Sequence, residues 1–391
     1  MPQFTVTPVT SKAERGEFVD FVYTSNANDP NFVPQLRAEE LEKFTPGGNP
    51  YFEHARCQLF LARASSGGGA RKVVGRIAAH IDELALTQPA AQGMGPGCGY
   101  WGALEADDEA IAAELIAIAE NWLRSEGMTR AMAPMTLSVW EEPGLLIKGH
   151  DHPPMVMMGH HSPKYQPWIE ARGYRPAKTL YTYDLDVTEP FPPLIQRIIA
   201  SGLRNSRIKI RGVDLKKFDQ EAAIILDILN DAWRDNWGFV PITDSEVAYT
   251  ARKLKPLVKS DLVRIAELDG VPVAFMMTLP DLNQVQKRAC GKNGKPSPLG
   301  WIKLALWLFR TKPADVRVPL MGVRKSLQAS RLASQLAFIM VEDVRRASAE
   351  NYGGKRAEFG WVLDDNQGMN SIAREIHSKI NKEYVIYDKG L

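Results

Sequence analysis

The order of elements after residue 316 constrains the fold more than any other feature of the sequence. An apolar strand at 316–323 leads into a basic, glycine-poor turn at 324–330 and then into a long amphipathic helix at 331–349. Three further elements follow: a strand at 357–366, a short helix at 367–380 and a closing strand at 383–389. Alternation of this kind predicts an α/β protein in which helices pack on a mixed sheet.

A similar order is predicted once before in the chain. It begins with a strand at 4–9, a helix from Ser11 and a hairpin that pairs 59–64 with 73–81 and turns at Gly67, Gly68 and Gly69. A strand at 98–104, a helix and a strand at 130–135 complete it. The apolar positions of that helix are Ile111, Leu115, Ile118 and Trp122. In the second half, a helix at 218–233 precedes a hairpin at 262–280 turned by Asp269 and Gly270. Because 391 residues suffice for two cores, we expect two units, residues 1–190 and 191–391.

Composition places the chain among globular proteins and points to no particular partner. Hydrophobic residues make up 45% and charged residues 24%, and the net charge is +2. Cys57, Cys98 and Cys290 lack the spacing of a zinc site or a disulfide framework, so we expect reduced thiols. We expect neither a signal peptide nor a membrane-spanning helix, and therefore a cytoplasmic protein.

The order after residue 316 resembles the acyl-CoA-binding half of the GNAT superfamily of N-acyltransferases. The segments NPYFEHARCQLFLAR, GHDHPPMVMMGHHSPKY, NWGFVP and FGWVLDDNQGMNSI also resemble a bacterial family of tandem GNAT-like proteins. Some of its members, including bacterial ceramide synthases, are associated with sphingolipid synthesis. The resemblance implies two tandem GNAT-like folds and an N-acyltransferase that moves an acyl group from acyl-CoA to an amine such as a sphingoid base.

Charge distinguishes the two units as sites for coenzyme A, whose diphosphate requires backbone N–H groups and cations. The turn of the first unit carries Glu105, Asp107, Asp108 and Glu109, which would repel a diphosphate and suit the first turn of their own helix. We therefore expect the first unit to be degenerate and to bind no cofactor. The turn of the second unit is basic, so this unit is the expected acyl-CoA site.

The resemblance implies specific cofactor contacts in the second unit. In the family pattern, a Gln or Arg is followed after two residues by a Gly, and after one more residue by a Gly or Ala. In this sequence the three positions are Gln328, Arg331 and Ala333. Arg331 replaces the central glycine and either crowds the diphosphate or adds a charged contact. The expected acyl-CoA-binding residues are Val323 through its backbone amide, Arg324, Lys325, Gln328, Ser330, Arg331, Ala333 and Asn366. The alternatives are a solvated helix start for the turn and a simple N-cap for Asn366.

Aminolysis of a thioester requires a group that accepts a proton. Alternation along 357–364 puts Glu358 and Asp364 on one strand face, and we expect Glu358, then Asp364, as the catalytic base. Either could instead be a surface or capping carboxylate. The tyrosine that many GNAT proteins carry in the next helix is absent, since Ala373 and Arg374 occupy that region. The sequence therefore identifies no general acid.

Two segments suggest the acceptor site. DAWRDNWGFVP (231–241) offers Trp233, Asn236, Trp237 and Phe239 as a wall for an apolar substrate, or as an aromatic plug at a helix end. HDHPPMVMMGHHSPKY (150–165) carries four histidines, of which His160 is the expected substrate contact. The spacing of these histidines fits no helical pair of ligands, so we expect no metal.

The segment 297–312 is apolar nearly all round and is surrounded by basic residues. This pattern suits a helix at the surface of the inner membrane, or a buried helix with a solvated basic rim. Two other functions stay open: a Fem-type aminoacyl transferase, and a non-catalytic lipid-binding protein of a sphingolipid pathway. The low net charge disfavours the RNA-binding surface that a Fem-type enzyme needs, and we expect no nucleic-acid partner.

Overall fold

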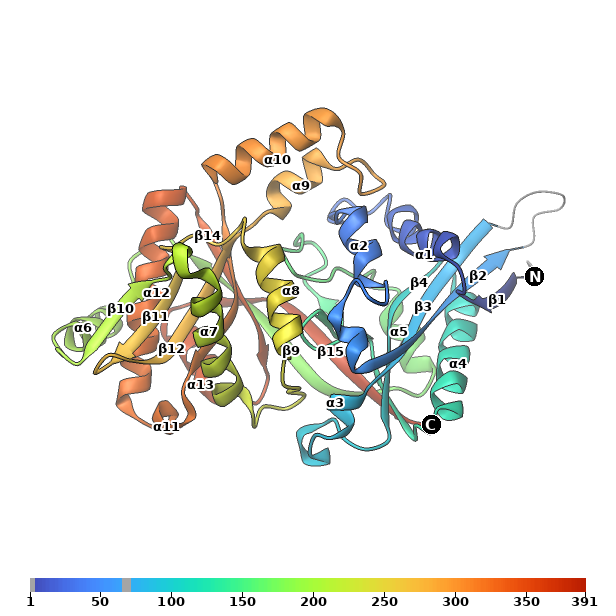
Figure 1. The fold of residues 1–391 in the computed structure, drawn as a ribbon, viewed down its shortest axis with the longest axis horizontal. Helices are drawn as coiled ribbons and strands as arrows, with labels where there is room; N and C mark the ends of the chain where they lie inside the picture. Colours follow the sequence, from blue (N-terminus) through green and yellow to red (C-terminus); the bar gives the residue numbers. More distant parts are fainter. Residues whose placement is uncertain (1–3, 65–71) are drawn as a thin grey trace.

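A thirteen-stranded sheet runs through the molecule and carries helices on both faces (Figure 1). The structure, a computed structural model, describes residues 4–64 and 72–391. The strands lie in the order β1-β2-β3-β4-β5-β15-β9-β14-β13-β12-β11-β10, and β8 pairs with β15 outside this path. The mixed α/β sheet predicted from the sequence is therefore confirmed.

The strands of the first 190 residues are β1 (Phe4–Pro8), β2 (Ala55–Ala64), β3 (Lys72–Asp82), β4 (Cys98–Ala106), β5 (Arg130–Ala133), β6 (Met135–Thr136), β7 (Glu142–Pro143), β8 (Leu145–Lys148) and β9 (Arg175–Asp186). Their helices are α1 (Lys12–Ser25), α2 (Arg37–Lys43), α3 (Glu83–Leu86), α4 (Glu109–Ser125) and α5 (Tyr165–Ala171). The predicted hairpin is β2 paired with β3; its turn at Gly67, Gly68 and Gly69 lies outside the described residues.

The later strands are β10 (Ile208–Gly212), β11 (Val263–Leu268), β12 (Val271–Pro280), β13 (Val316–Val323), β14 (Arg356–Leu363) and β15 (Lys379–Gly390). The later helices are α6 (Pro193–Leu203), α7 (Phe218–Trp233), α8 (Asp244–Leu254), α9 (Asn283–Ala289), α10 (Pro298–Arg310), α11 (Lys325–Gln328), α12 (Arg331–Tyr352) and α13 (Gln367–Glu375). The predicted helix at 367–380 is too long, because Ile376 ends α13 and His377 takes a left-handed φ of 59°.

The two units share strands at the centre of the sheet. β9 precedes residue 190 but pairs antiparallel with β14, and β15 pairs antiparallel with both β5 and β9. The closing strand of each unit thus lies beside a strand of the other unit. The sheet is continuous across residue 190, and the boundary between the units remains a prediction.

Alternating side chains of each central strand fill cores on opposite faces of the sheet. On β12, Ala274 and Met276 pack into the core under α6 and α12, whereas Phe275 and Met277 pack into the core under α7. This period of two is the geometry of a strand buried on both faces. The helices therefore hold the ends of β13 and β14 in fixed positions.

Candidate active site

β13 and β14 are paired only over their first residues. The parallel register joins Val316 to Ala357, Arg317 to Glu358 and Val318 to Phe359. β13 then continues to Val323 and β14 to Leu363 without further pairing between them. The two strands diverge into a gap that we call the C-terminal wedge, whose backbone edges can bind an amide-containing chain.

The corresponding gap of the N-terminal unit is filled. β4 and β5 are also paired over three positions only, from Cys98 with Arg130 to Tyr100 with Met132. Beyond them β6 enters the gap, and the Ala103 N–H donates to Thr136 Oγ1 at 3.0 Å. Gly102 permits this approach, because a Cβ atom there would overlap the Met135 carbonyl oxygen. β6 therefore occupies part of this N-terminal wedge, while Ala103 to Glu105 of β4 line the central cavity described next.

A cavity of about 720 Å³ lies where the two units meet. The C-terminal wedge opens into it, since Val318 to Met321 of β13 and Phe359 to Leu363 of β14 line its wall. A volume of this size suits a small-molecule substrate and is large enough to hold a long apolar chain.

Aromatic side chains form a continuous wall of the cavity. Trp233 donates its indole N–H to the Met321 carbonyl of β13 at 3.0 Å and stacks on Trp140 with ring centroids 5.7 Å apart. Phe239 packs edge-on against Trp140 at 5.9 Å. All five predicted acceptor contacts line the cavity: Trp233, Asn236, Trp237, Phe239 and His160.

Two adjacent carboxylates project into this apolar cavity. Glu141 and Glu142 are half-buried and line its wall beside β7. Burial raises the pKa of both groups above the ordinary value. Neither forms an ion pair with a Lys or Arg among the described residues. A carboxylate in such surroundings is stabilised by a cationic ligand and is suited to accept a proton.

Contacts connect Glu142 to the C-terminal wedge. His161 Nε2 lies 3.5 Å from Glu142 Oε1, and its Nδ1 accepts the Leu146 N–H at 3.2 Å, which leaves the proton on Nε2. Glu142 also packs against Gly159, whose carbonyl accepts the Tyr384 hydroxyl at 3.0 Å. The Tyr384 ring lies edge-on to Trp361 of β14 at 5.7 Å. Glu142, which the sequence analysis missed, thus lies on the cavity wall near the wedge.

Glu358, the expected catalytic base, does not line the cavity, which argues against this assignment. Its carboxylate is fully buried, and both oxygens lie 2.8 Å from Lys382 Nζ. Arg356 adds a third bond at 2.9 Å. A buried carboxylate with two cationic partners has no free position for a substrate proton.

The buried charges around Glu358 hold the wedge open. Arg317 lies opposite Glu358 in the register and donates to the Gly360 carbonyl at 3.3 Å. It also donates to the carbonyls of Val156 and Met157. Burial lowers the pKa of Arg317 to about 10. Because the Arg317 side chain binds the Gly360 carbonyl, that group does not pair with β13.

The second expected base, Asp364, lies outside the cavity. Its exposed carboxylate pairs with Lys178 at 3.2 Å, so it lacks the buried setting expected of a base. Asn366 has both properties that the sequence left as alternatives. Its side chain caps α13 by accepting the Met369 N–H at 3.1 Å, and the residue lines the cavity.

The basic turn follows β13 outside the cavity. Arg324 pairs with Asp227, and Lys325 pairs with Asp235 while its N–H donates to Asp231 at 2.8 Å. Acidic residues on and after α7 therefore offset two of the cations. Surface pairs of this kind contribute about 0–1 kcal/mol each, so a phosphate can compete for these cations.

The start of α12 contains the rest of the expected diphosphate site. Ser330 caps the helix by accepting the Ala333 N–H at 3.4 Å, and Gln328 donates to the Val323 carbonyl at 2.9 Å. Arg331 is exposed and forms no ion pair with the residues that the structure describes. The expected cofactor residues from Val323 to Ala333 thus lie together at one turn, and Asn366 is reached through the wedge.

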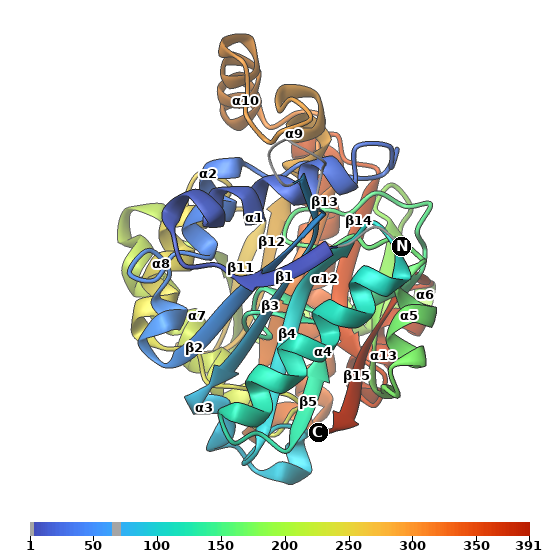
Figure 2. The same ribbon diagram turned by 90° about the vertical axis from the view of Figure 1, so that its right-hand side faces the viewer.

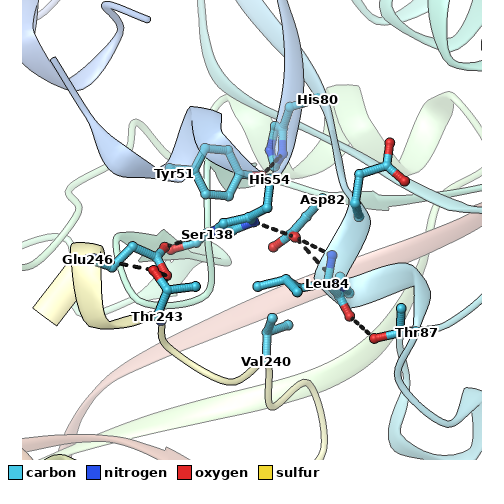
Figure 3. A network of polar contacts seen from close by, with 12 residues as sticks. Tyr51, His54, His80, Asp82, Leu84, Thr87, Ser138, Val240, Thr243 and Glu246 are labelled. Carbon is cyan, nitrogen blue, oxygen red and sulfur yellow. Dashed lines mark hydrogen bonds and ion pairs between the residues drawn. The ribbon is translucent and has the colours of Figure 1, made fainter. Parts of the chain in front are cut away.

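A polar network at the cavity edge joins the two units (Figure 3). His54 Nδ1 lies 3.0 Å from Asp82 Oδ1, and its Nε2 lies 3.4 Å from Glu246 Oε1 of α8. Burial opposes protonation, but the bonds to both carboxylates outweigh it and raise the pKa of His54 to about 10. His54 is therefore a cationic bridge rather than a base.

The histidine-rich loop is held by hydrogen bonds. His160 Nε2 lies 2.9 Å from Asp29 Oδ2, and His150 Nε2 lies 3.2 Å from the Leu146 carbonyl. Across residues 4–64 and 72–391, no three His, Cys, Asp or Glu side chains are grouped to hold a metal ion. Within the same ranges, no helix is long and apolar enough to cross a membrane.

Comparison with known proteins relates the whole chain to two bacterial proteins. It is 39% identical over 389 residues to the bacterial ceramide synthase of Caulobacter vibrioides, covering 99% of this chain and 97% of that protein. It is 34% identical over 386 residues to YghO of Escherichia coli, covering 97% and 94%. No protein-family model matches the chain.

Solved structures resemble the fold at low identity. A tandem GNAT protein from the clavulanic acid biosynthesis pathway matches with a TM-score of 0.55 and 13% identity over 99% of this chain and 98% of its own. A GCN5-related N-acetyltransferase from Sphaerobacter thermophilus matches at 0.51 and 12%, over 99% and 95%. These matches confirm the predicted tandem GNAT fold. The chain therefore belongs to the same family as the bacterial ceramide synthase, a family of acyltransferases with this fold.

Proposed function

We propose that this acyltransferase moves an acyl group from acyl-CoA to the amine of a long-chain lipid such as a sphingoid base. One observation carries the proposal: a cavity of about 720 Å³ joins the C-terminal wedge, an aromatic wall and two carboxylates that form no ion pair with a described Lys or Arg. The ammonium group of a long-chain amine would lie beside the two carboxylates, and its apolar tail would pack against the aromatic wall. The name of the Caulobacter relative supports the same acceptor class.

In this proposal the C-terminal unit, residues 191–391, binds acyl-CoA. The diphosphate lies at the start of α12, where Arg331 and the backbone N–H groups meet it, and Arg324 and Lys325 add positive charge. The amide-containing arm of coenzyme A then runs along the open edges of β13 and β14. The Arg324 N–H donates to the Val273 carbonyl of β12, so alternation directs the Val323 N–H toward the wedge. That amide is our proposed donor to the thioester carbonyl oxygen.

The N-terminal unit, residues 1–190, supplies the groups that act on the acceptor. The ammonium first gives a proton to Glu142, which takes the place of the expected base Glu358. The neutral amine nitrogen then bonds to the thioester carbon, the carbon–sulfur bond breaks, and the second proton of the amine passes through solvent to the sulfur, so that coenzyme A leaves as its thiol. Glu141 adds negative charge beside the incoming ammonium. Burial raises the pKa of Glu142, which makes it a stronger base than an exposed carboxylate.

We further propose a cytoplasmic enzyme that contacts the inner membrane peripherally through 297–312. A long-chain amine resides in the bilayer, and the enzyme must reach it there. The exposed apolar side chains of α10 support this location, because they include Leu299, Ile302 and Phe309. The proposal requires neither a metal nor a nucleic-acid partner.

The direct test follows release of coenzyme A by the purified full chain. Long-chain acyl-CoA is incubated with a sphingoid base, a simple long-chain amine, a short-chain amine and a long-chain alcohol, and products are identified by mass spectrometry. We expect release with the long-chain amines and an N-acyl product, with little release for the alcohol. Absence of release with every amine, together with no thermal shift on adding coenzyme A, would contradict the proposal.

A further inference from the structure

Helix α10 has two apolar faces, and one of them is turned toward the protein. Leu304 is buried and Leu308 half-buried on that face, and both line the cavity together with Trp301, which is 54% exposed. Leu299, Ile302, Leu306 and Phe309 are exposed, from 54% for Ile302 to 85% for Phe309. At 100° per residue the two sets project from nearly opposite sides of the helix. The helix is thus a thin apolar partition between the cavity and the outside.

The same region is strongly basic. Residues 282–314 contain seven basic residues and no acidic one, in a chain whose net charge is +2. The basic residues are Lys287, Arg288, Lys292, Lys295, Lys303, Arg310 and Lys312, and all of them are exposed. None forms an ion pair with another described residue. An exposed apolar stripe bordered by cations is complementary to an anionic lipid surface.

The position of α10 makes this surface accessible. α9 and α10 form a helical pair that stands out from the rest of the molecule (Figures 1 and 2). Gly300 packs so closely on Ala289 that a Cβ atom there would overlap the Ala289 carbonyl, which fixes α10 on α9. Lys259 Nζ also binds the Leu308 carbonyl at 3.1 Å near the end of α10. The apolar stripe is therefore held outward rather than folded onto the core.

We propose that α10 is the portal through which a bilayer-embedded acceptor enters the cavity. Its outer face inserts among the acyl chains of an anionic membrane, and its inner face offers the lipid tail an apolar path past Trp301 to the aromatic wall. The tail then never crosses water, which otherwise opposes the transfer of a long apolar chain. This inference rests on the proposed long-chain acceptor.

Membrane binding is tested with the full chain and sedimented vesicles. We expect binding to phosphatidylcholine vesicles that contain phosphatidylglycerol, weaker binding to phosphatidylcholine alone, and a decrease with salt. Leu306→Glu with Phe309→Glu should reduce binding about tenfold or more. Lys303→Glu with Arg310→Glu should do the same without touching the apolar stripe. Leu203→Glu, at a 64% exposed leucine on α6, is the control.

Activity assays distinguish a portal, which passes the acceptor into the cavity, from an anchor, which only holds the protein at the membrane. The Leu306→Glu, Phe309→Glu variant should act on a short soluble amine at the wild-type rate but lose about tenfold or more on a vesicle-embedded acceptor. Tethering it to vesicles through a polyhistidine tag and a nickel-chelating lipid should not restore that rate. Full restoration would reduce α10 to an anchor and overturn the portal.

Three other outcomes also contradict the inference. Wild-type binding of the double variant to anionic vesicles would show that the stripe does not enter the bilayer. A concentration-dependent dimer that both double variants abolish would assign the stripe to a second copy of the chain. Undiminished activity of both double variants on embedded acceptor would exclude α10 as the route of entry. Failure of the wild-type chain on every amine would instead contradict the proposed function itself.

Discussion

The two wedges of this molecule start from the same strand geometry, but a strand enters the N-terminal wedge whereas the C-terminal wedge stays open. β4 with β5 and β13 with β14 each pair over three positions and then diverge. In the N-terminal unit β6 fills the gap, and the following turn carries Glu141 and Glu142 into the central cavity. In the C-terminal unit the gap stays open and leads to a basic turn. In our proposal, the N-terminal copy of this element binds no cofactor and supplies side chains to the site of the C-terminal copy.

The acidic turn after β4 shows the same divergence. Glu105 is buried and accepts bonds from Tyr165 at 2.6 Å and from Asn26 at 3.1 Å, and Asp108 caps α4. These acids serve the folded structure of the N-terminal unit. At the equivalent place, Arg331 of the C-terminal unit is exposed and free of ion pairs with described residues.

The largest expected effect comes from removing a carboxylate that the N-terminal unit contributes to the cavity. Glu142→Gln should lower kcat about 10²–10⁴-fold and leave coenzyme A binding unchanged, because a proton acceptor is removed and the wedge is not. Since burial raises the pKa of Glu142, wild-type activity should fall as pH drops through that raised value, and the variant should lack this limb. Steady-state rates measured across a range of pH test both expectations. Glu83→Gln, at an exposed acid of α3, is the control, and an equal loss there would remove Glu142 from the mechanism.

The next effect tests what keeps the C-terminal wedge open. Glu358→Gln should lower the free energy of unfolding by about 3–5 kcal/mol, because Lys382 and Arg356 lose a buried partner. Asp364→Asn, at an exposed acid of the same strand end, should change it little. Urea unfolding gives both values. A stable Glu358→Gln variant with abolished chemistry would restore Glu358 as the base.

A smaller effect tests the filled wedge. Thr136→Val removes the acceptor for the half-buried Ala103 N–H and should cost about 1–3 kcal/mol of stability. Affinity for coenzyme A should not change, because the N-terminal wedge binds none. Unfolding curves and calorimetric titration of the same preparation separate the two readouts. A gain or loss of coenzyme A binding here would mean that the N-terminal wedge is a ligand site.

The smallest expected effect concerns the bridge between the units. The folded pKa of His54, about 10, lies above its unfolded value, so its stabilisation is complete below about pH 6.5 and is lost as pH rises through 10. His54→Gln should therefore cost about 1 kcal/mol at pH 6, after allowance for solvent screening, and little at high pH. His152→Gln, at a histidine whose side chain is 45% exposed, is the control. A cost that does not depend on pH would show that the bridge is uncharged.

The sequence predicted the elements with strong local signals. α7 and β13 have the expected bounds, and Asp269 and Gly270 form the expected turn with positive φ angles of 52° and 81°. The aromatic residues of 231–241 line the cavity because they follow a helix end beside β13. β9 was missed, since its partners β14 and β15 are far away in sequence and only tertiary pairing defines it.

The proposed base was missed for a related reason. Strand alternation placed Glu358 on a face, but only the fold brings Lys382 from β15 to both of its oxygens. Glu142 begins the two-residue strand β7 and carries no motif, so no local pattern distinguishes it. Its adjacency to Glu141, between apolar segments, is the signal that sequence reasoning had available.

The most direct test of the account is the number of coenzyme A sites. Calorimetric titration of the full chain with a non-reactive acyl-CoA thioether should give one site per chain. Arg331→Ala should weaken it by about 1–3 kcal/mol, and Arg197→Ala, at an exposed arginine of α6, should not change it. Two sites per chain, or an affinity indifferent to Arg331, would contradict the claim that only the C-terminal unit holds the thioester.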